Sequence, residues 1–229
     1  MKNIYEELNK SLLFNGIDQE DISAMLACLN AKIKNYKKNQ NIFMVGDKNE
    51  AVGFVVSGSI QIIKEDFLGN RTIIAQIGGG QLFAEAFACA GVKRIPVSVV
   101  ANTDSTVLFI DYNRIVHSCS NTCAFHHRLI ENMLQILAQK NVYLNDKIEH
   151  LSRRSTKDKV LSYLSSQAQK TGKRHFEIPF NRQELADYLC VDRSALSNEL
   201  CKLRDMGVLE FNRNEFTLSE SYDEEDYTS

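Results

Sequence analysis

The chain has 229 residues, which suits one large domain or two modest domains. Apolar residues make up 44% of the sequence and charged residues 24%, and no run reaches the roughly 18 apolar residues of a membrane span. The opening MKNIYEELNKSLLF is mixed and amphipathic, unlike a secretory signal peptide. We therefore expect a cytoplasmic protein with no membrane partner, whose six cysteines are thiols. The net charge of −2 excludes a global basic field, so any affinity for nucleic acid must be regional.

Residues 1–36 have the pattern of helices, and Asp18 is placed to cap one of them. From about Ile42 the apolar period changes to two, and short apolar runs alternate with glycine-containing turns. Six or more short strands with such turns predict a small β-barrel or roll. The segment of about 42–110 is large enough to enclose a ligand cavity, as small barrels do.

Residues 113–151 return to a helical period and carry two apolar stripes. The first stripe alternates by four and three over three heptads, with an asparagine at one a position, and it predicts a parallel two-stranded coiled coil between two copies of the chain. The alternative is a helix buried within a monomer. The residues of this seam are Ile130, Leu134, Leu137, Asn141, Leu144, Ile148 and Leu151. The second stripe, expected to face the β-roll, consists of Phe125, Leu129, Met133, Ile136 and Tyr143.

Residues 152–156 interrupt the heptads and are expected to form a hinge. A helix with Val160, Leu161 and Leu164 inward follows, ends near Gly172, and leads to the strand HFEIPF. Four cysteines, Cys28, Cys89, Cys190 and Cys201, are expected to pack as small apolar residues.

The stretch 181–208, NRQELADYLCVDRSALSNELCKLRDMGV, predicts two short helices joined by a tight turn. Asn181 and Glu184 have the spacing of a capping box, and Asp192 is a good N-cap for the second helix. One face of that helix is apolar, through Leu196, Leu200 and Leu203. Residues 207–218 predict a small β-hairpin, the wing, around a turn at 212–215.

The other face of the second helix carries polar side chains of middling length and no acid: Arg193, Ser194, Ser197 and Asn198. Such a helix can lie in the major groove, so we expect these four residues to contact base edges. Arg182 and Gln183, at the start of the first helix, are expected to contact phosphates. Residues 153–218 carry twelve Lys and Arg against nine Asp and Glu. The alternative is an ordinary amphipathic hairpin with a solvated face.

These elements predict an α+β chain in four parts. Residues 1–112 form a helix and β-roll domain with room for a ligand cavity, and residues 113–152 form the long dimerisation helix. Residues 153–218 form a winged helix-turn-helix domain. Residues 219–229 form an acidic tail that is expected to be disordered.

This order of elements resembles the Crp/Fnr family of bacterial transcription regulators over roughly residues 10–218. The residues that carry the resemblance are the Gly46-Asp47 turn, Val55 to Ile60, Phe83-Ala84-Glu85, the heptad helix, Arg182 to Ala186 and Arg193 to Ser197. The resemblance implies a cupin-like jelly-roll domain that resembles a cyclic-nucleotide-binding domain. It also implies a homodimer that binds palindromic promoter DNA and RNA polymerase. Residues 1–112 would be its effector-sensing domain, with allosteric control by a small molecule or a redox signal at the β-roll.

Two departures argue against cyclic AMP as that effector. Relatives that bind cyclic nucleotides have a glycine where this chain has Ala84, and an arginine where it has Ile95. Without that guanidinium a buried phosphodiester lacks its charge partner. The sequence leaves the effector unknown; an apolar or weakly anionic small molecule is expected. The expected pocket residues are Phe83, Glu85, Phe87 and Arg94.

Residues 1–27 contain no cysteine, so the N-terminal iron–sulfur cluster of the oxygen-sensing relatives is not expected. An alternative function is a haem, metal or redox sensor whose helix-turn-helix serves protein contacts only. It would use the region that contains His117, Cys119, Cys123 and His126. The spacing of these residues matches no standard ligand template, so we predict no metal site. The β-segment has no histidine and no convincing carboxylate pair, and an enzyme is not expected.

Overall fold

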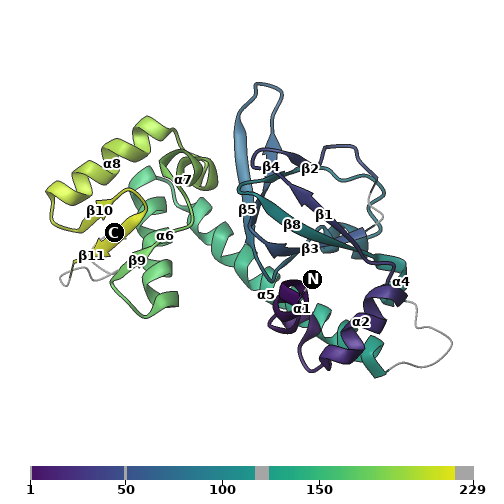
Figure 1. Cartoon of the computed structure of the whole chain (residues 1–229). Helices are drawn as coiled ribbons and strands as arrows, with labels where there is room; N and C mark the ends of the chain where they lie inside the picture. The colour runs from purple at the N-terminus through teal and green to yellow at the C-terminus, as the bar shows by residue number, and fades with distance from the viewer. Residues whose placement is uncertain (1, 49–50, 117–123, 220–229) are drawn as a thin grey trace. The chain divides into compact units, whose positions relative to one another are not determined.

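The computed structural model describes residues 2–48, 51–116 and 124–219, and shows an α+β chain (Figure 1). The chain forms two compact units: Met1–Asp66 with Ile74–Asn141, and Phe67–Ile73 with Val142–Ser229. The helix α5, Ala124–Ser152, contributes to both. The acidic tail beyond Ser219 and the cysteines and histidine of residues 117–123 lie outside the described residues.

The first unit is built around the β-roll, which has two four-stranded sheets with the orders β1-β8-β3-β6 and β2-β7-β4-β5. The pairings β1–β8, β3–β8 and β4–β7 are antiparallel, as a roll requires. This confirms the predicted fold class. The strands are β1 Lys32–Tyr36, β2 Asn41–Phe43, β3 Ala51–Ser57, β4 Ser59–Glu65, β5 Arg71–Gly78, β6 Leu82–Phe83, β7 Ser98–Ala101 and β8 Ser105–Asp111.

The prediction of helix through residue 36 is wrong at its end, because Lys32–Tyr36 forms β1. The run KIKNY is too polar to show a clear period, and its pairing with β8, from Lys32 opposite Phe109 to Tyr36 opposite Ser105, decides its conformation. The remaining elements of this part of the chain are α1 Lys2–Asn9, the short 3-10 helix η1 Leu12–Phe14, α2 Gln19–Cys28, α3 Glu85–Cys89 and α4 Tyr112–Val116. The helix α2 begins after Asp18 as predicted, although the Asp18 side chain makes no capping hydrogen bond.

The core of the first unit joins the N-terminal helices, one face of the roll and the first part of α5. Leu129, Met133 and Ile136 of α5 are buried in this core, and Phe125 packs against it. The second apolar stripe therefore faces the roll as predicted for these four residues. The prediction is wrong for Tyr143, whose hydroxyl instead donates to the hydroxyl of Tyr188 in the second unit, at 3.0 Å.

A second core fills the interior of the roll with aromatic rings. Phe83 is fully buried, and its ring centroid lies 6.0 Å from that of Phe43 and 6.3 Å from that of Phe109. A Cβ atom at Gly53 would lie 2.2 Å from the Phe83 ring, so this ring packs directly on the backbone of β3. The roll therefore needs glycine at position 53.

The described residues of the second unit form the helices α6, α7 and α8, the end of α5 and a three-stranded sheet of order β10-β11-β9. Its elements, besides the end of α5 and residues 67–73, are α6 Thr156–Thr171, β9 His175–Glu177, α7 Arg182–Leu189, α8 Arg193–Asp205, β10 Leu209–Asn212 and β11 Glu215–Leu218. Val160, Leu161 and Leu164 of α6 are buried, as predicted, and α6 ends at Thr171, followed by the C-cap Gly172, whose φ is +65°. The predicted wing is the β10–β11 hairpin.

Two further expectations can be compared with the structure. The helix α5 ends at Ser152 and α6 starts at Thr156, so the expected break is present, whereas the boundary between the two units lies between Asn141 and Val142. The expectation that four cysteines pack inside is wrong for Cys89, Cys190 and Cys201, which are exposed; only Cys28 is partly buried.

Candidate DNA-binding surface and effector region

The start of α7 is set by a capping box. The Asn181 side-chain oxygen accepts hydrogen bonds from the backbone N–H groups of Gln183 and Glu184, at 2.9 and 3.0 Å, and the Glu184 carboxylate accepts from the Asn181 N–H at 2.8 Å. This confirms the predicted cap. It satisfies orphan donors at the helix start and fixes Arg182 and Gln183 as the first two helical residues.

The turn between the two helices depends on a left-handed residue. Cys190 has φ +53°, and the N–H of the next residue, Val191, bonds the Ala186 carbonyl at 3.1 Å. The helix α8 then begins after Asp192, which has the extended backbone of an N-cap but makes no side-chain capping bond. Its carboxylate can stabilise the helix only through its charge at the positive end of the dipole.

The two faces of α8 differ as predicted. Leu196, Leu200 and Leu203 are buried, while the opposite face presents Arg193, Ser194 and Asn198 to solvent and Ser197 partly so. Because the apolar face anchors the helix, the polar side chains near its N-terminus are held outward together. That is the arrangement of a helix that contacts base edges.

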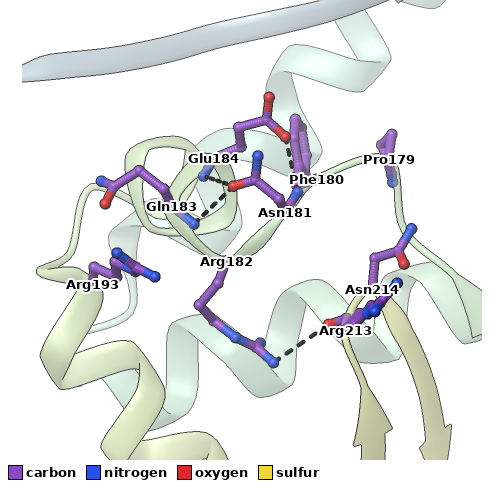
Figure 2. A pocket seen from close by; sticks show the side chains of 9 residues that line it. All are labelled: Pro179, Phe180, Asn181, Arg182, Gln183, Glu184, Arg193, Arg213 and Asn214. Atoms are coloured by element: carbon purple, nitrogen blue, oxygen red, sulfur yellow. Dashed lines mark hydrogen bonds between the residues drawn. The ribbon is translucent and has the colours of Figure 1, made fainter.

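A surface hollow of about 650 Å³ lies beside this face (Figure 2). Its lining residues come from the starts of α7 and α8 and from the tip of the wing: Pro179, Phe180, Asn181, Arg182, Gln183, Glu184, Arg193, Arg213 and Asn214. Three guanidinium groups therefore meet at one depression, as an anionic partner requires.

The three arginines of the hollow differ in what they contact. Within the described residues, the Arg193 and Arg213 side chains form no hydrogen bond or ion pair. Arg182 is partly buried and donates to the Arg213 carbonyl at 3.4 Å, and burial lowers its pKa. The other expected phosphate contact, Gln183, is exposed, and its side-chain amide donates to Asp187 at 2.8 Å.

Sequence reasoning missed Arg213. It lies at the turn of the wing with φ +54°, between strands that pair Asn212 with Glu215. The signal was a basic residue at the tip of a predicted hairpin next to a helix-turn-helix.

The expected effector residues lie in different surroundings. Phe83 is fully buried in the core of the roll, and Phe87 packs partly buried against the same core. Arg94 is exposed and donates to the Gly46 carbonyl at 2.7 Å. Glu85 is buried, with 2% of its surface exposed. The structure therefore brings Phe83 and Phe87 into one core and directs Arg94 to a loop.

Glu85 has a partner that sequence reasoning missed. The Lys140 ammonium of α5 contacts one Glu85 carboxylate oxygen at 2.7 Å and also donates to the Leu82 carbonyl at 2.6 Å. The other carboxylate oxygen of Glu85 is buried and forms no hydrogen bond within the described residues. Lys140 had no distinctive sequence signal, because it lies beside the seam like other polar residues of the helix.

Ala84 and Ile95 occupy the two positions at which the sequence departs from relatives that bind cyclic nucleotides. Ala84 has the left-handed conformation that favours glycine, with φ +63°, and carries a Cβ atom that glycine lacks. Ile95 is buried, with 1% exposure, and supplies no charge. The ammonium of Lys140 already pairs with the Glu85 carboxylate.

A buried lysine lies in the part of α5 that belongs to the second unit. Lys147 is buried, donates to the Ile73 carbonyl at 2.5 Å, and lies 4.0 Å from the centroid of the Tyr188 ring. Burial lowers the Lys147 pKa to about 8. Burial also raises the pKa values of Tyr163 and Tyr188. These groups connect α5 with α7 of the helix-turn-helix.

The seam of α5 carries exposed apolar side chains. Leu134 is 62% exposed, Leu144 44% and Ile148 64%. Ile130 and Leu137 are partly buried against the core of the first unit. Apolar groups this exposed along one helix indicate a surface for another molecule.

The region of the alternative sensor function cannot be assembled from the described residues. His117, Cys119 and Cys123 lie outside them, and His126 is a buried residue of α5. Elsewhere in the described chain, no three His, Cys, Asp or Glu side chains are grouped to hold a metal ion. The helices of residues 2–48, 51–116 and 124–219 include none that is long and apolar enough to cross a membrane.

Comparisons with known proteins match both units. The chain matches the model of the cyclic nucleotide-binding domain over residues 33–121 and that of the Crp-like helix-turn-helix domain over residues 158–220. It is 23% identical over 201 residues to the cyclic AMP receptor protein of Thermus thermophilus, covering 87% of this chain and 88% of that protein. It is 23% identical over 185 residues to the transcriptional activator protein FnrL of Cereibacter sphaeroides, covering 77% and 71%.

The fold is also found among solved structures. The c-di-GMP responsive global regulator CLP of Xanthomonas campestris has a TM-score of 0.72 at 20% identity, over 89% of this chain and 100% of that chain. The two domain matches occur in the order of the β-roll and the helix-turn-helix described above. The chain belongs to the Crp/Fnr family of transcription regulators.

Proposed function

We propose that this protein is a homodimeric regulator that binds palindromic promoter DNA through α8 and responds to a small molecule at the β-roll. The observation that carries the proposal is the exposed start of α8, where Arg193 and the neighbouring polar side chains border the arginine-lined hollow. A guanidinium at this place can pair with the O6 and N7 atoms of a guanine. Asn198 favours adenine, because an amide matches the N6 and N7 edge.

The homodimer is supported by the exposed seam of α5. A parallel coiled coil would bury the exposed side chains of Leu134, Leu144 and Ile148. Asn141, at an a position, would favour a two-stranded coiled coil and fix the register of its helices. A two-fold dimer then requires half-sites about one helical turn apart, roughly 34–36 Å. The dimer would act in the cytoplasm together with RNA polymerase.

The effector is proposed to act at the region of Phe83, Glu85, Phe87 and Arg94. The ion pair of the buried Glu85 with the partly buried Lys140 supports this place, because a ligand that competes for either charge would act directly on α5. The chemistry of the surroundings favours an apolar or weakly anionic molecule. Ala84 and Ile95 argue against cyclic AMP.

Binding to duplex DNA at several salt concentrations tests the proposal. For a DNA-binding regulator, the logarithm of the binding constant falls linearly with the logarithm of the salt concentration, because phosphate neutralisation releases counterions. The alternative, in which the helix-turn-helix serves only protein contacts, gives no such duplex binding. The comparisons with transcription regulators do not favour that alternative.

A further inference from the structure

We propose that Arg182 is a positioning residue, which holds the wing against α7 and α8 so that Arg213 faces the DNA. This inference rests on the proposed DNA binding and assigns Arg182 a different task from the phosphate contact expected from its place in the sequence.

The contacts of Arg182 are directed at the wing. Its guanidinium carbon lies 4.8 Å from the centroid of the Phe211 ring and 5.7 Å from that of Phe216. One of its nitrogens donates to the carbonyl of Arg213 at the wing tip, at 3.4 Å, as Figure 2 shows. The side chain therefore contacts both strands of the hairpin and its turn, and this leaves less of its donor set for a phosphate.

Phe211 is held from both helices of the motif. Arg204, near the end of α8, places its guanidinium carbon 5.7 Å from the same ring, while its Nη2 atom pairs with Asp205 at 3.1 Å. Two guanidinium groups from α7 and α8 thus interact with one aromatic ring of β10. This arrangement fixes the wing relative to the recognition helix.

The other side of the wing is tied to β9. The Asn214 side-chain amide donates to the Glu177 carboxylate at 2.7 Å and to the Ile178 carbonyl at 3.2 Å. The Ile178 N–H donates to the Asn214 carbonyl at 2.9 Å. Asn214 therefore fixes the base of the turn, while Arg182 holds the carbonyl of Arg213 itself. Loss of Arg182 would leave the hairpin paired and release its tip.

Arginine is required for this task because its planar guanidinium can stack on a ring and donate a hydrogen bond at the same time. A lysine keeps the positive charge but cannot reproduce that geometry. The two possible roles of Arg182 therefore separate in the Arg182→Lys variant. A phosphate contact tolerates the change, whereas a positioning residue does not.

The test compares Arg182→Ala, Arg182→Lys, Arg213→Ala and the double alanine variant in binding to one DNA duplex at fixed salt. We expect Arg213→Ala to lose about tenfold in affinity, the loss typical of one charge-assisted contact. Arg182→Ala and Arg182→Lys should lose a similar factor, and the double variant little more than either single variant. Losses that multiply in the double variant, or near-normal binding by Arg182→Lys, would show a direct phosphate contact and overturn the proposal.

Amide hydrogen exchange of the DNA-free protein gives a second readout. The amides of the wing tip, residues 212–215, should exchange faster in Arg182→Ala, and in Phe211→Leu if the first variant does not fold, but at the wild-type rate in Arg213→Ala. Unchanged exchange in a folded Arg182→Ala or Phe211→Leu protein would contradict the positioning role. This arm does not use DNA, so it stays informative if wild-type protein binds no duplex, the result that would instead remove the proposed function.

Discussion

The ammonium of Lys147 lies over the ring of Tyr188, 4.0 Å from its centroid, and both side chains are buried. The contact joins the last third of α5 to α7 of the helix-turn-helix. The ring face and a carbonyl stabilise the charged ammonium less well than water does. Burial therefore lowers the Lys147 pKa to about 8.

This shift predicts how stability depends on pH. Between about pH 8 and the ordinary lysine value the unfolded chain binds more protons, so the free energy of unfolding should rise with pH, by at most about 1.4 kcal/mol per pH unit. Urea denaturation between pH 7 and 9.5 measures this rise in the free energy of unfolding. The upper limit avoids the opposite contribution of Tyr163 and Tyr188, whose raised pKa values lower stability above their ordinary range. Lys147→Met should flatten the rise and the exposed-site control Lys64→Met should keep it; a rise that survives Lys147→Met contradicts the assignment.

The seam predicts the oligomeric state. Replacing both Leu134 and Ile148 by lysine should give folded monomers in sedimentation experiments, because these side chains are exposed in one chain but would be buried charges in the coiled coil. Val142→Lys is a matched control: Val142 is also 62% exposed but lies outside the seam, so this variant should remain dimeric. Dimers of the double variant would place the interface elsewhere.

Arg193 is predicted to identify a base. Arg193→Ala should weaken binding to a selected palindrome by about 1–3 kcal/mol per contacted guanine and relax one position of each half-site. Arg213→Ala is the comparison, because loss of a phosphate contact should weaken all sequences alike and reduce the salt slope by about 0.9. Competition assays with a randomised duplex library measure both. If Arg193→Ala weakens every sequence equally, Arg193 contacts a phosphate.

Two exposed cysteines give a paired prediction about backbone conformation. Cys190 has φ +53°, so Cys190→Gly should raise the free energy of unfolding by up to about 1 kcal/mol through relief of left-handed strain, partly offset by the freer unfolded chain. Cys201 lies inside α8, so Cys201→Gly should lower it by about 0.5 kcal/mol. Thermal denaturation compares the two. Destabilisation of equal size at both sites would mean that backbone strain at Cys190 is unimportant.

Cyclic AMP is predicted not to bind. Calorimetric titration should give no micromolar affinity, because Ile95 offers no charge and Lys140 is engaged by Glu85. The presence of cyclic AMP should likewise leave DNA affinity unchanged. Micromolar binding would show that the region rearranges around the nucleotide, with Arg94 or Lys140 as its cation.

The helix-turn-helix was predictable because its signals are local. Asn181 with Glu184, and Leu196 with Leu200, lie within one or two turns of each other, and short-range hydrogen bonds and periodicity determine their positions. The heptads of α5 were readable for the same reason. The second stripe was readable from the same periodicity. Its prediction failed only at Tyr143, which lies in the second unit and whose hydroxyl donates to that of Tyr188, a residue of the same unit.

The parts that could not be predicted depend on contacts distant in the sequence. Lys140 pairs with a residue 55 positions away, and β1 forms because β8 lies beside it. Arg213 matters because the wing brings it beside Arg182 and Arg193 in one hollow. No periodicity or cap at these residues indicates such neighbours. Arg213 had a local signal, its place at the tip of the predicted hairpin, but its neighbours follow only from the folded chain.

Two lysines one heptad apart on α5 form hydrogen bonds whose donors are sensitive to substitution and whose acceptors are not. Lys140 and Lys147 each donate to a main-chain carbonyl, of Leu82 and of Ile73. Every amino acid carries that carbonyl, so substitutions at 82 or 73 that preserve the backbone leave the acceptor in place. Changes at 140 or 147 remove the donor outright. These two hydrogen bonds can therefore be retained while the side chains at positions 82 and 73 change during evolution. A search for paired substitutions across relatives would miss them.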